Sequence, residues 1–235
     1  MFIKICGIKT FDAIDCACDS YTKDSSNVNI SAKIIQGPQK SIKATHLGFN
    51  FVPQSPRFVS LDQAVLLRDY IKNRAQTVAV LIDPDDLQII DIVAKLKPDY
   101  IQLHGGETCE RIKEIKQVSK CGIIKAFSIK NNQTVMEAKK ISERCDFILL
   151  DAPAPVGQAY SGGHGVTFDT TLLKEVSFDC PWFLAGGLTP ENVVAMCKKN
   201  NPDGVDVASG VEHIRGHKSP QLIARFLQNI ANYLG

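Results

Sequence analysis

The sequence predicts an α/β fold, a single (β/α)8 TIM barrel. Short runs rich in β-branched and aromatic residues alternate with segments whose apolar residues recur every three or four positions. This alternation is typical of strand–helix units that build a parallel sheet. Eight such units fit into the 235 residues, and eight parallel strands close into a barrel. An open doubly wound sheet is the rival, but the GxGxxG turn of that fold does not follow the first strand.

The predicted strands are short apolar runs, and the helices between them begin at recognisable capping residues. Ser60 precedes one helical pattern. Thr189-Pro190 and Ser219-Pro220 each place a proline at a first helical position. The strands are expected at residues 2–6, 45–51, 77–82, 100–103, 122–127, 147–150, 182–185 and 204–207.

One polar segment, residues 19–43, interrupts the alternation between the first helix and the second strand. It is rich in Ser, Asn and Lys, whereas connections in such folds usually take about 2–6 residues. Apolar residues from Val28 to Ile34 alternate with polar ones, a pattern compatible with an extra edge strand. Because surface loops tolerate insertions, we expect a solvated surface insertion within one barrel domain that spans residues 1–235.

Composition and charge exclude several classes of protein. The formal net charge is +2 and the basic residues form no stripe, so nucleic acid is not an expected partner. Apolar runs fall far short of the roughly 18 residues of a membrane span, and no leader-like segment opens the chain. The eight cysteines show no CxxC pair and no metal-ligand spacing, which favours reduced thiols in the cytoplasm.

Chemically useful side chains recur where the predicted strands end. In a parallel barrel these ends meet at one rim, which carries the active site. Each residue taken alone also has an ordinary structural interpretation: a cysteine in an apolar strand is most often a small buried side chain. Their shared position at one rim favours a functional site. The candidates are Cys6, Arg57, Gln102, His104, Asp151 and Asp206.

Two glycine-containing turns follow the last two predicted strands, Gly186-Gly187 and Ser209-Gly210. Barrels often bind phosphate there, because glycine lets backbone N–H groups approach an oxyanion closely. The sequence therefore predicts a phosphate site at these turns. A long Gly/Pro-rich loop at residues 152–167 is expected to form a mobile lid.

Seven longer motifs, which include the candidate site residues, are spread over nearly the whole chain. Their order and spacing resemble those of the phosphoribosylanthranilate isomerase family of tryptophan biosynthesis. The motifs are KICGIKT (4–10), GFNFVPQSPRFVS (48–60), IQLHGGE (101–107), FILLDA (147–152), SGGHGVTFD (161–169), FLAGGLTPENV (183–193) and GVDVASGVE (204–212).

The resemblance implies an Amadori rearrangement of N-(5-phosphoribosyl)anthranilate to 1-(2-carboxyphenylamino)-1-deoxyribulose 5-phosphate, without metal or cofactor. It implies Cys6 as general base, Asp151 as general acid and Arg57 as the group that holds the anthranilate carboxylate. The glycine turns then hold the phosphate. A monomer or homodimer acting on a phosphorylated small molecule is expected. This chain departs from the family pattern in the lid, where it carries His164 and Val166.

Two other kinds of function are compatible with parts of the sequence. Indole-glycerol-phosphate synthase or a ribulose-phosphate epimerase would share the glycine turns. The first is expected to carry catalytic lysine and glutamate at the strand ends and the second a metal-binding His/Asp set, and neither pattern is visible. A non-catalytic barrel that only binds ligand is the other alternative, and the presence of both Cys6 and Asp151 argues against it.

Overall fold

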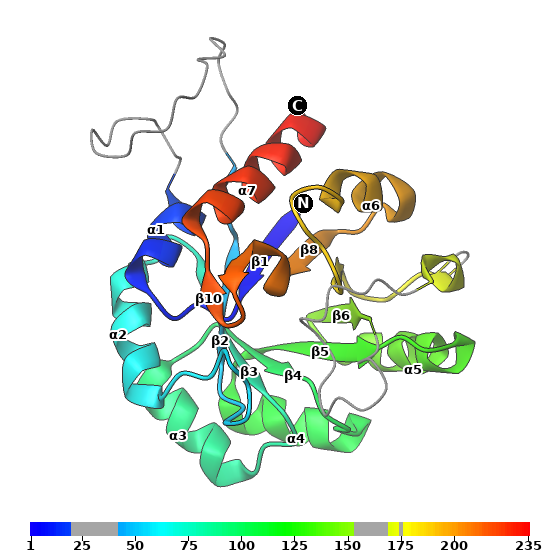
Figure 1. Ribbon diagram of the computed structural model, residues 1–235. Helices are drawn as coiled ribbons and strands as arrows, with labels where there is room; N and C mark the ends of the chain where they lie inside the picture. The colour runs from blue at the N-terminus through cyan, green and yellow to red at the C-terminus, as the bar shows by residue number, and fades with distance from the viewer. Residues whose placement is uncertain (20–41, 153–168, 174–175) are drawn as a thin grey trace.

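The computed structural model describes residues 1–19, 42–152, 169–173 and 176–235, and these form a closed parallel β-barrel ringed by helices (Figure 1). The strands pair in chain order, and the first strand pairs with the eighth to close the barrel. The predicted fold class is confirmed, and the predicted strand ends differ from the observed ones by one residue or less. The strands are β1 (Phe2–Cys6), β2 (His46–Asn50), β3 (Gln76–Leu81), β4 (Tyr100–Leu103), β5 (Gly122–Ser128), β6 (Phe147–Asp151), β7 (Trp182–Leu184) and β8 (Gly204–Val207).

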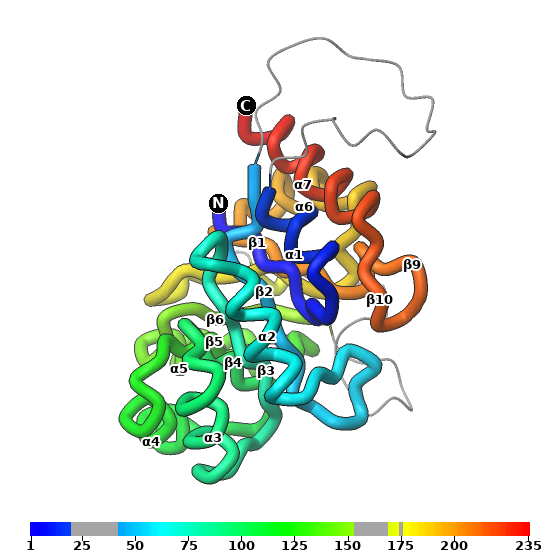
Figure 2. The backbone as a smooth tube through the Cα atoms, turned by 90° about the vertical axis from the view of Figure 1, so that its left-hand side faces the viewer, coloured from blue at the N-terminus to red at the C-terminus, as the bar shows by residue number. Residues whose placement is uncertain are grey.

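Helices cover the outside of the barrel, and α1 and α7 lie side by side where the ring of helices closes (Figures 1 and 2). Hydroxyl side chains cap several of them: Ser60 accepts from the backbone N–H of Gln63, and Ser219 accepts from that of Leu222. The helices are α1 (Phe11–Cys18), α2 (Leu61–Ile71), α3 (Asp86–Leu96), α4 (Cys109–Ser119), α5 (Asn132–Ser142), α6 (Val193–Asn200) and α7 (Pro220–Leu234).

The helix start predicted at Thr189-Pro190 is wrong, because α6 begins at Val193. The side chain of Asn192 accepts from the backbone N–H of Thr189 at 2.8 Å and donates to the Gly187 carbonyl at 2.8 Å. These bonds satisfy the backbone in a turn conformation and delay the helix by about one turn.

Short elements complete the described fold after β6 and β8. A 3-10 helix, η1 (Thr170–Leu173), precedes β7, and a second, η2 (Ser209–Val211), follows β8. An antiparallel hairpin of β9 (Glu212–Ile214) and β10 (His217–Lys218) comes next, and the strand pattern of the sequence did not predict it. In the described part of the chain, no helix combines the length and apolar character that a membrane span requires.

The predicted insertion at 19–43 and the predicted lid at 152–167 fall almost entirely outside the described residues. Helix α1 ends before Asp19. After the undescribed residues, the chain packs against α1 again at Ala44, whose N–H donates to the Ala17 carbonyl at 2.8 Å. The surface location of the insertion therefore stays a prediction.

Aromatic rings fill the end of the barrel where the strands begin. Phe2, His46, Tyr100, Phe147 and Phe183 pack with ring centroids 5.0–6.3 Å apart, mostly edge to face. Burial lowers the pKa of His46 to about 4, so its ring is neutral at physiological pH and packs as an aromatic. This end of the barrel is a closed core, which leaves the opposite end for a cavity.

Replacing Phe183 by alanine should destabilise the fold by about 3–5 kcal/mol, because the wholly buried ring would leave a cavity inside the barrel. Urea unfolding followed by circular dichroism measures the change. Leu66→Ala is the control, since that side chain is 64% exposed and should alter stability by less than about 0.5 kcal/mol. A loss below about 1 kcal/mol for Phe183→Ala would show that the aromatic cluster is not part of the stabilising core.

Candidate active site

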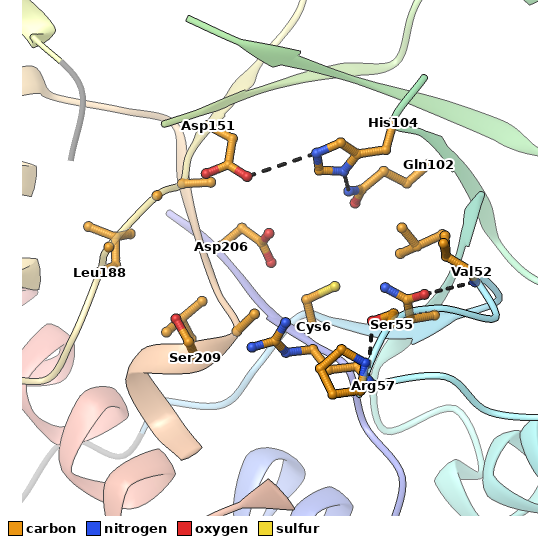
Figure 3. A pocket seen from close by; sticks show the side chains of 18 of the residues that line it. Cys6, Val52, Ser55, Arg57, Gln102, His104, Asp151, Leu188, Asp206 and Ser209 are labelled. Carbon is orange, nitrogen blue, oxygen red and sulfur yellow. Dashed lines mark hydrogen bonds and ion pairs between the residues drawn. The ribbon is translucent and has the colours of Figure 1, made fainter. Parts of the chain in front are cut away.

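A cavity of about 260 Å³ opens at the carboxyl ends of the strands (Figure 3). Every predicted site residue except Gly210 lines it. The cavity therefore brings together predicted site residues of four strands, β1, β4, β6 and β8, and of the loops that follow β2, β4, β7 and β8. The predicted residues that line it are Cys6, Arg57, Gln102, His104, Asp151, Gly186, Gly187, Asp206 and Ser209.

Cys6 ends β1 and directs its thiol into the cavity (Figure 3). The side chain is 7% exposed and packs among the inward-facing residues of the barrel, including Val80 and Ala185. Opposite it on β2 stands Gly48, which pairs with Cys6 in register. The thiol is thus held by strands at the end of the barrel interior.

Lys4, two residues before Cys6, lies on the same side of β1 and is wholly buried. Its ammonium forms an ion pair with Asp206 of β8, with Nζ 2.9 Å from Oδ1. Burial lowers the pKa of Lys4, but Asp206 and Cys6 together outweigh burial, and the pKa of Lys4 is raised. Sequence reasoning missed this lysine, although a charged residue in an apolar strand at i−2 from a candidate base was a usable signal.

Asp151 ends β6 and is 4% exposed. Burial raises the pKa of this carboxyl to about 7, and the nearby charge of Asp206 adds to the rise. The Ala152 N–H, which donates to Oδ1 at 2.8 Å, and the cations Lys4 and Arg57 oppose that rise. The pKa value means that protonated and ionised forms of Asp151 coexist near neutral pH, as a general acid requires.

His104 faces Asp151 across the cavity, with Nε2 3.9 Å from Oδ2 (Figure 3). Burial, with the charges of Lys125 and Lys4, lowers the pKa of His104 to about 4. The ring is therefore neutral at physiological pH and offers hydrogen bonds rather than a charge. Its Nδ1 lies 3.3 Å from Nε2 of Gln102, whose buried Oε1 has no hydrogen-bond partner among the described residues.

Arg57 lies in the loop after β2, and its side chain is buried. Its Nε and Nη2 donate to the two carboxylate oxygens of Glu212, at 2.7 and 2.9 Å. Sequence reasoning did not single out Glu212, because it follows η2, beyond the strand end where site residues were sought. The side chain of Arg57 reaches the cavity beside Cys6 (Figure 3).

The two predicted phosphate turns lie next to each other at the rim. Gly186 and Gly187 both have positive φ, 83° and 63°, a conformation that L side chains rarely adopt. Gly187 and Ser209 line the cavity. Gly210 lies behind them, where a side chain would overlap the Leu188 carbonyl. Gly210 thus lets η2 pack closely on the loop after β7, and the phosphate contact predicted for it stays a prediction.

Buried ionisable groups that share one cavity at this rim are typical of an active site, and fold and site together define a (β/α)8-barrel enzyme. The family model for N-(5'phosphoribosyl)anthranilate (PRA) isomerase matches residues 25–229. The chain belongs to this isomerase family, so the resemblance drawn from the sequence motifs is confirmed.

Individual relatives agree with this assignment. The N-(5'-phosphoribosyl)anthranilate isomerase of Brucella canis is 36% identical over 230 residues, which cover 98% of this chain and 94% of that protein. The crystal structure of the Thermotoga maritima phosphoribosyl anthranilate isomerase superposes with a TM-score of 0.79 at 28% identity, covering 97% of this chain and 98% of that one. A related isomerase in complex with reduced 1-(o-carboxyphenylamino)-1-deoxyribulose 5-phosphate superposes with a TM-score of 0.76 at 26% identity, covering 97% of both chains.

Asp151 should titrate near pH 7, well above the usual range of a carboxyl, because burial penalises its charged form. Infrared difference spectra between about pH 5 and pH 9 should show a protonated carboxyl band that disappears with a midpoint near 7. The Asp151→Asn variant should lack this band. A band that is identical in both proteins would show that another group titrates.

Proposed function

We propose that this chain isomerises N-(5'-phosphoribosyl)anthranilate to 1-(2-carboxyphenylamino)-1-deoxyribulose 5-phosphate in tryptophan biosynthesis, with Cys6 as general base and Asp151 as general acid. The observation that carries the proposal is the pairing of a thiol with a carboxyl of pKa about 7 in one cavity, in a chain of this family. The two groups reach the cavity from β1 and β6 (Figure 3).

The reaction begins with opening of the sugar ring. Asp151 gives its proton to the ring oxygen while the C1–O bond breaks, and the lone pair of the anthranilate nitrogen forms a C=N bond to C1. The resulting iminium makes the C2 proton acidic, and the Cys6 thiolate removes it. The enol then becomes a ketone as O2 loses a proton and C1 gains one, so that the product is an isomer of the substrate.

The remaining predicted residues would hold the substrate at its two charged ends and at its sugar. Arg57 is assigned to the anthranilate carboxylate, since a guanidinium pairs with a carboxylate through charge-assisted hydrogen bonds. The backbone N–H groups of the turns at Gly186-Gly187 and Ser209-Gly210 are assigned to the phosphate. Such contacts at both ends would fix the reacting carbon atoms between acid and base.

The sugar hydroxyls have three assigned partners. The buried Oε1 of Gln102 is an acceptor without a partner among the described residues, so a substrate hydroxyl can satisfy it. The neutral ring of His104 can exchange hydrogen bonds with the ring oxygen or its neighbours. Asp206, held by Lys4, offers its second carboxylate oxygen.

We propose further that the chain works in the cytoplasm as a monomer or homodimer, without nucleic acid or membrane as partner. All eight cysteines are free thiols in the structure, as is typical of a reducing compartment. The Thermotoga maritima isomerase is described as dimeric, with monomers generated from it.

Cys6→Ala should lower kcat by roughly 10²–10⁴-fold or more while substrate still binds, because the variant lacks the proton acceptor at C2. Initial rates and the binding of a product analogue measure the two effects. Cys197→Ala is the matched control, since that thiol is also buried but lies in α6, and kcat should stay within a few-fold. A near-normal kcat for Cys6→Ala would disprove the assignment of the base.

Asp151→Asn should melt close to the wild type yet lose roughly 10²–10⁴-fold in kcat, since an amide keeps the size of the side chain but has no acidic proton. In the wild type, kcat/KM should fall as pH rises through about 7, because the carboxyl of the free enzyme must be protonated to act as acid. If Asp151 only caps a loop, the variant loses about 1 kcal/mol or less of stability and kcat stays within severalfold. An active variant would mean that the acid lies elsewhere.

A further inference from the structure

Glu212, at the start of the β9–β10 hairpin, is a buried carboxylate that the mechanism above does not use. Its side chain is 3% exposed and accepts two hydrogen bonds from Arg57. It accepts a third from Nζ of Lys218 at 2.8 Å and a fourth from the Gly216 N–H at 3.0 Å. Burial alone would raise the pKa of Glu212, but the bonds from Arg57 and the charge of Lys218 lower it to about 2. Glu212 is therefore ionised throughout the physiological range.

The guanidinium of Arg57 is fixed in its plane by this contact. A pair that uses Nε and Nη2 against both carboxylate oxygens is bidentate, and such a pair prevents rotation of the planar group. The aliphatic part of Arg57 packs on the backbone of Gly7, where a Cβ would lie 2.6 Å from Cδ of Arg57. The side chain of Arg57 is therefore held by two contacts, one with the backbone of Gly7 and one with the carboxylate of Glu212.

This fixed orientation matters for binding a carboxylate. Nη1 of Arg57 takes no part in the pair with Glu212, and Arg57 lines the cavity. An arginine that must order its side chain on binding loses rotamer entropy, and one that is already ordered does not. The ionic cluster still attracts an anion, because the cations Arg57 and Lys218 surround the single anion Glu212 and leave one positive charge.

We propose that Glu212 is a positioning residue, which acts through Arg57 to set the affinity of the site for the carboxylate of the substrate. The inference rests on the proposed role of Arg57. A purely structural role is the alternative, because Glu212 also ties the hairpin to Lys218, whose Nζ donates to the Ala208 carbonyl at 2.7 Å. The two roles predict different effects of a substitution at Glu212. If Glu212 positions Arg57, the substitution weakens the binding of ligands that carry a carboxylate. If Glu212 is only structural, ligands with and without a carboxylate are affected equally.

The test compares two ligands by calorimetry: reduced 1-(o-carboxyphenylamino)-1-deoxyribulose 5-phosphate and the same molecule without its carboxyl group. The ratio of their Kd values isolates the contribution of the carboxylate. In the wild type we expect a ratio of about 30 or more, the range of a charge-assisted hydrogen-bonded pair. Arg57→Ala should bring the ratio to about 1, and Glu212→Gln to below about 5. The double variant should match Arg57→Ala, because Glu212 acts through that residue.

Glu107→Gln is the matched control. Glu107 is equally buried and pairs with Lys125 at 3.0 Å, but it does not contact Arg57. Its ratio should stay at the wild-type value even if overall affinity changes. If Glu212→Gln does not fold, Glu212→Asp replaces it in the test. Aspartate keeps the negative charge, but its shorter side chain cannot pair both oxygens with Arg57, so we expect a ratio of Kd values between those of the wild type and Arg57→Ala.

The outcomes separate the inference from the proposed function. A wild-type ratio in Glu212→Gln, with a lost ratio in Arg57→Ala, would overturn the positioning role and keep that of Arg57. Equal weakening of both ligands in Glu212→Gln would assign Glu212 a structural role only, which also overturns the inference. A wild-type ratio in Arg57→Ala would remove the proposed role of Arg57 itself, and the inference with it.

Discussion

A buried ion pair between the first and last strands is the contact on which the rest of the structure depends. Lys4 and Asp206 pair in register across the seam where β8 meets β1, with Nζ and Oδ1 2.9 Å apart. Two buried charges are stable only in close contact, since leaving either one unpaired costs several kcal/mol. A slip of one residue would turn them to opposite faces and unpair both charges, so the pair favours the register that closes the barrel.

The same pair shapes the chemistry at the rim. The register that joins Lys4 to Asp206 also places Cys6, two residues further along β1, at the mouth of the cavity. Burial is the main cause of the raised pKa of Asp151, the negative charge of Asp206 adds to the rise, and the Lys4 ammonium opposes it. Lys4 and Asp206 therefore contribute both to the closure of the barrel and to the pKa of the proposed acid. The aromatic cluster at the other end of the barrel contributes stability without touching this cavity.

Much of the fold and of the site could be read from local sequence pattern. Strand runs such as 2–6 and 204–207 were predicted with their observed ends, because short β-rich apolar runs and the turn residues that flank them are local signals. The strand-end rule selected Cys6, Asp151 and Arg57, and the structure brings them to one cavity. The start of α6 was misplaced, since the side chain of Asn192 competes with the helix for backbone groups of the preceding turn.

The sequence by itself determined the class of fold, the family and the residue types at the strand ends. Each of these follows from short sequence segments, and each segment can be interpreted without knowing which distant residues contact it. Only the tertiary structure decided what surrounds those residues. Lys4 and Asp206 are separated by 202 positions and Arg57 and Glu212 by 155, so no local pattern could pair them. Burial, which raises the pKa of Asp151 and lowers that of His104, arises from the closed barrel as a whole, since desolvation depends on every chain segment packed around a group.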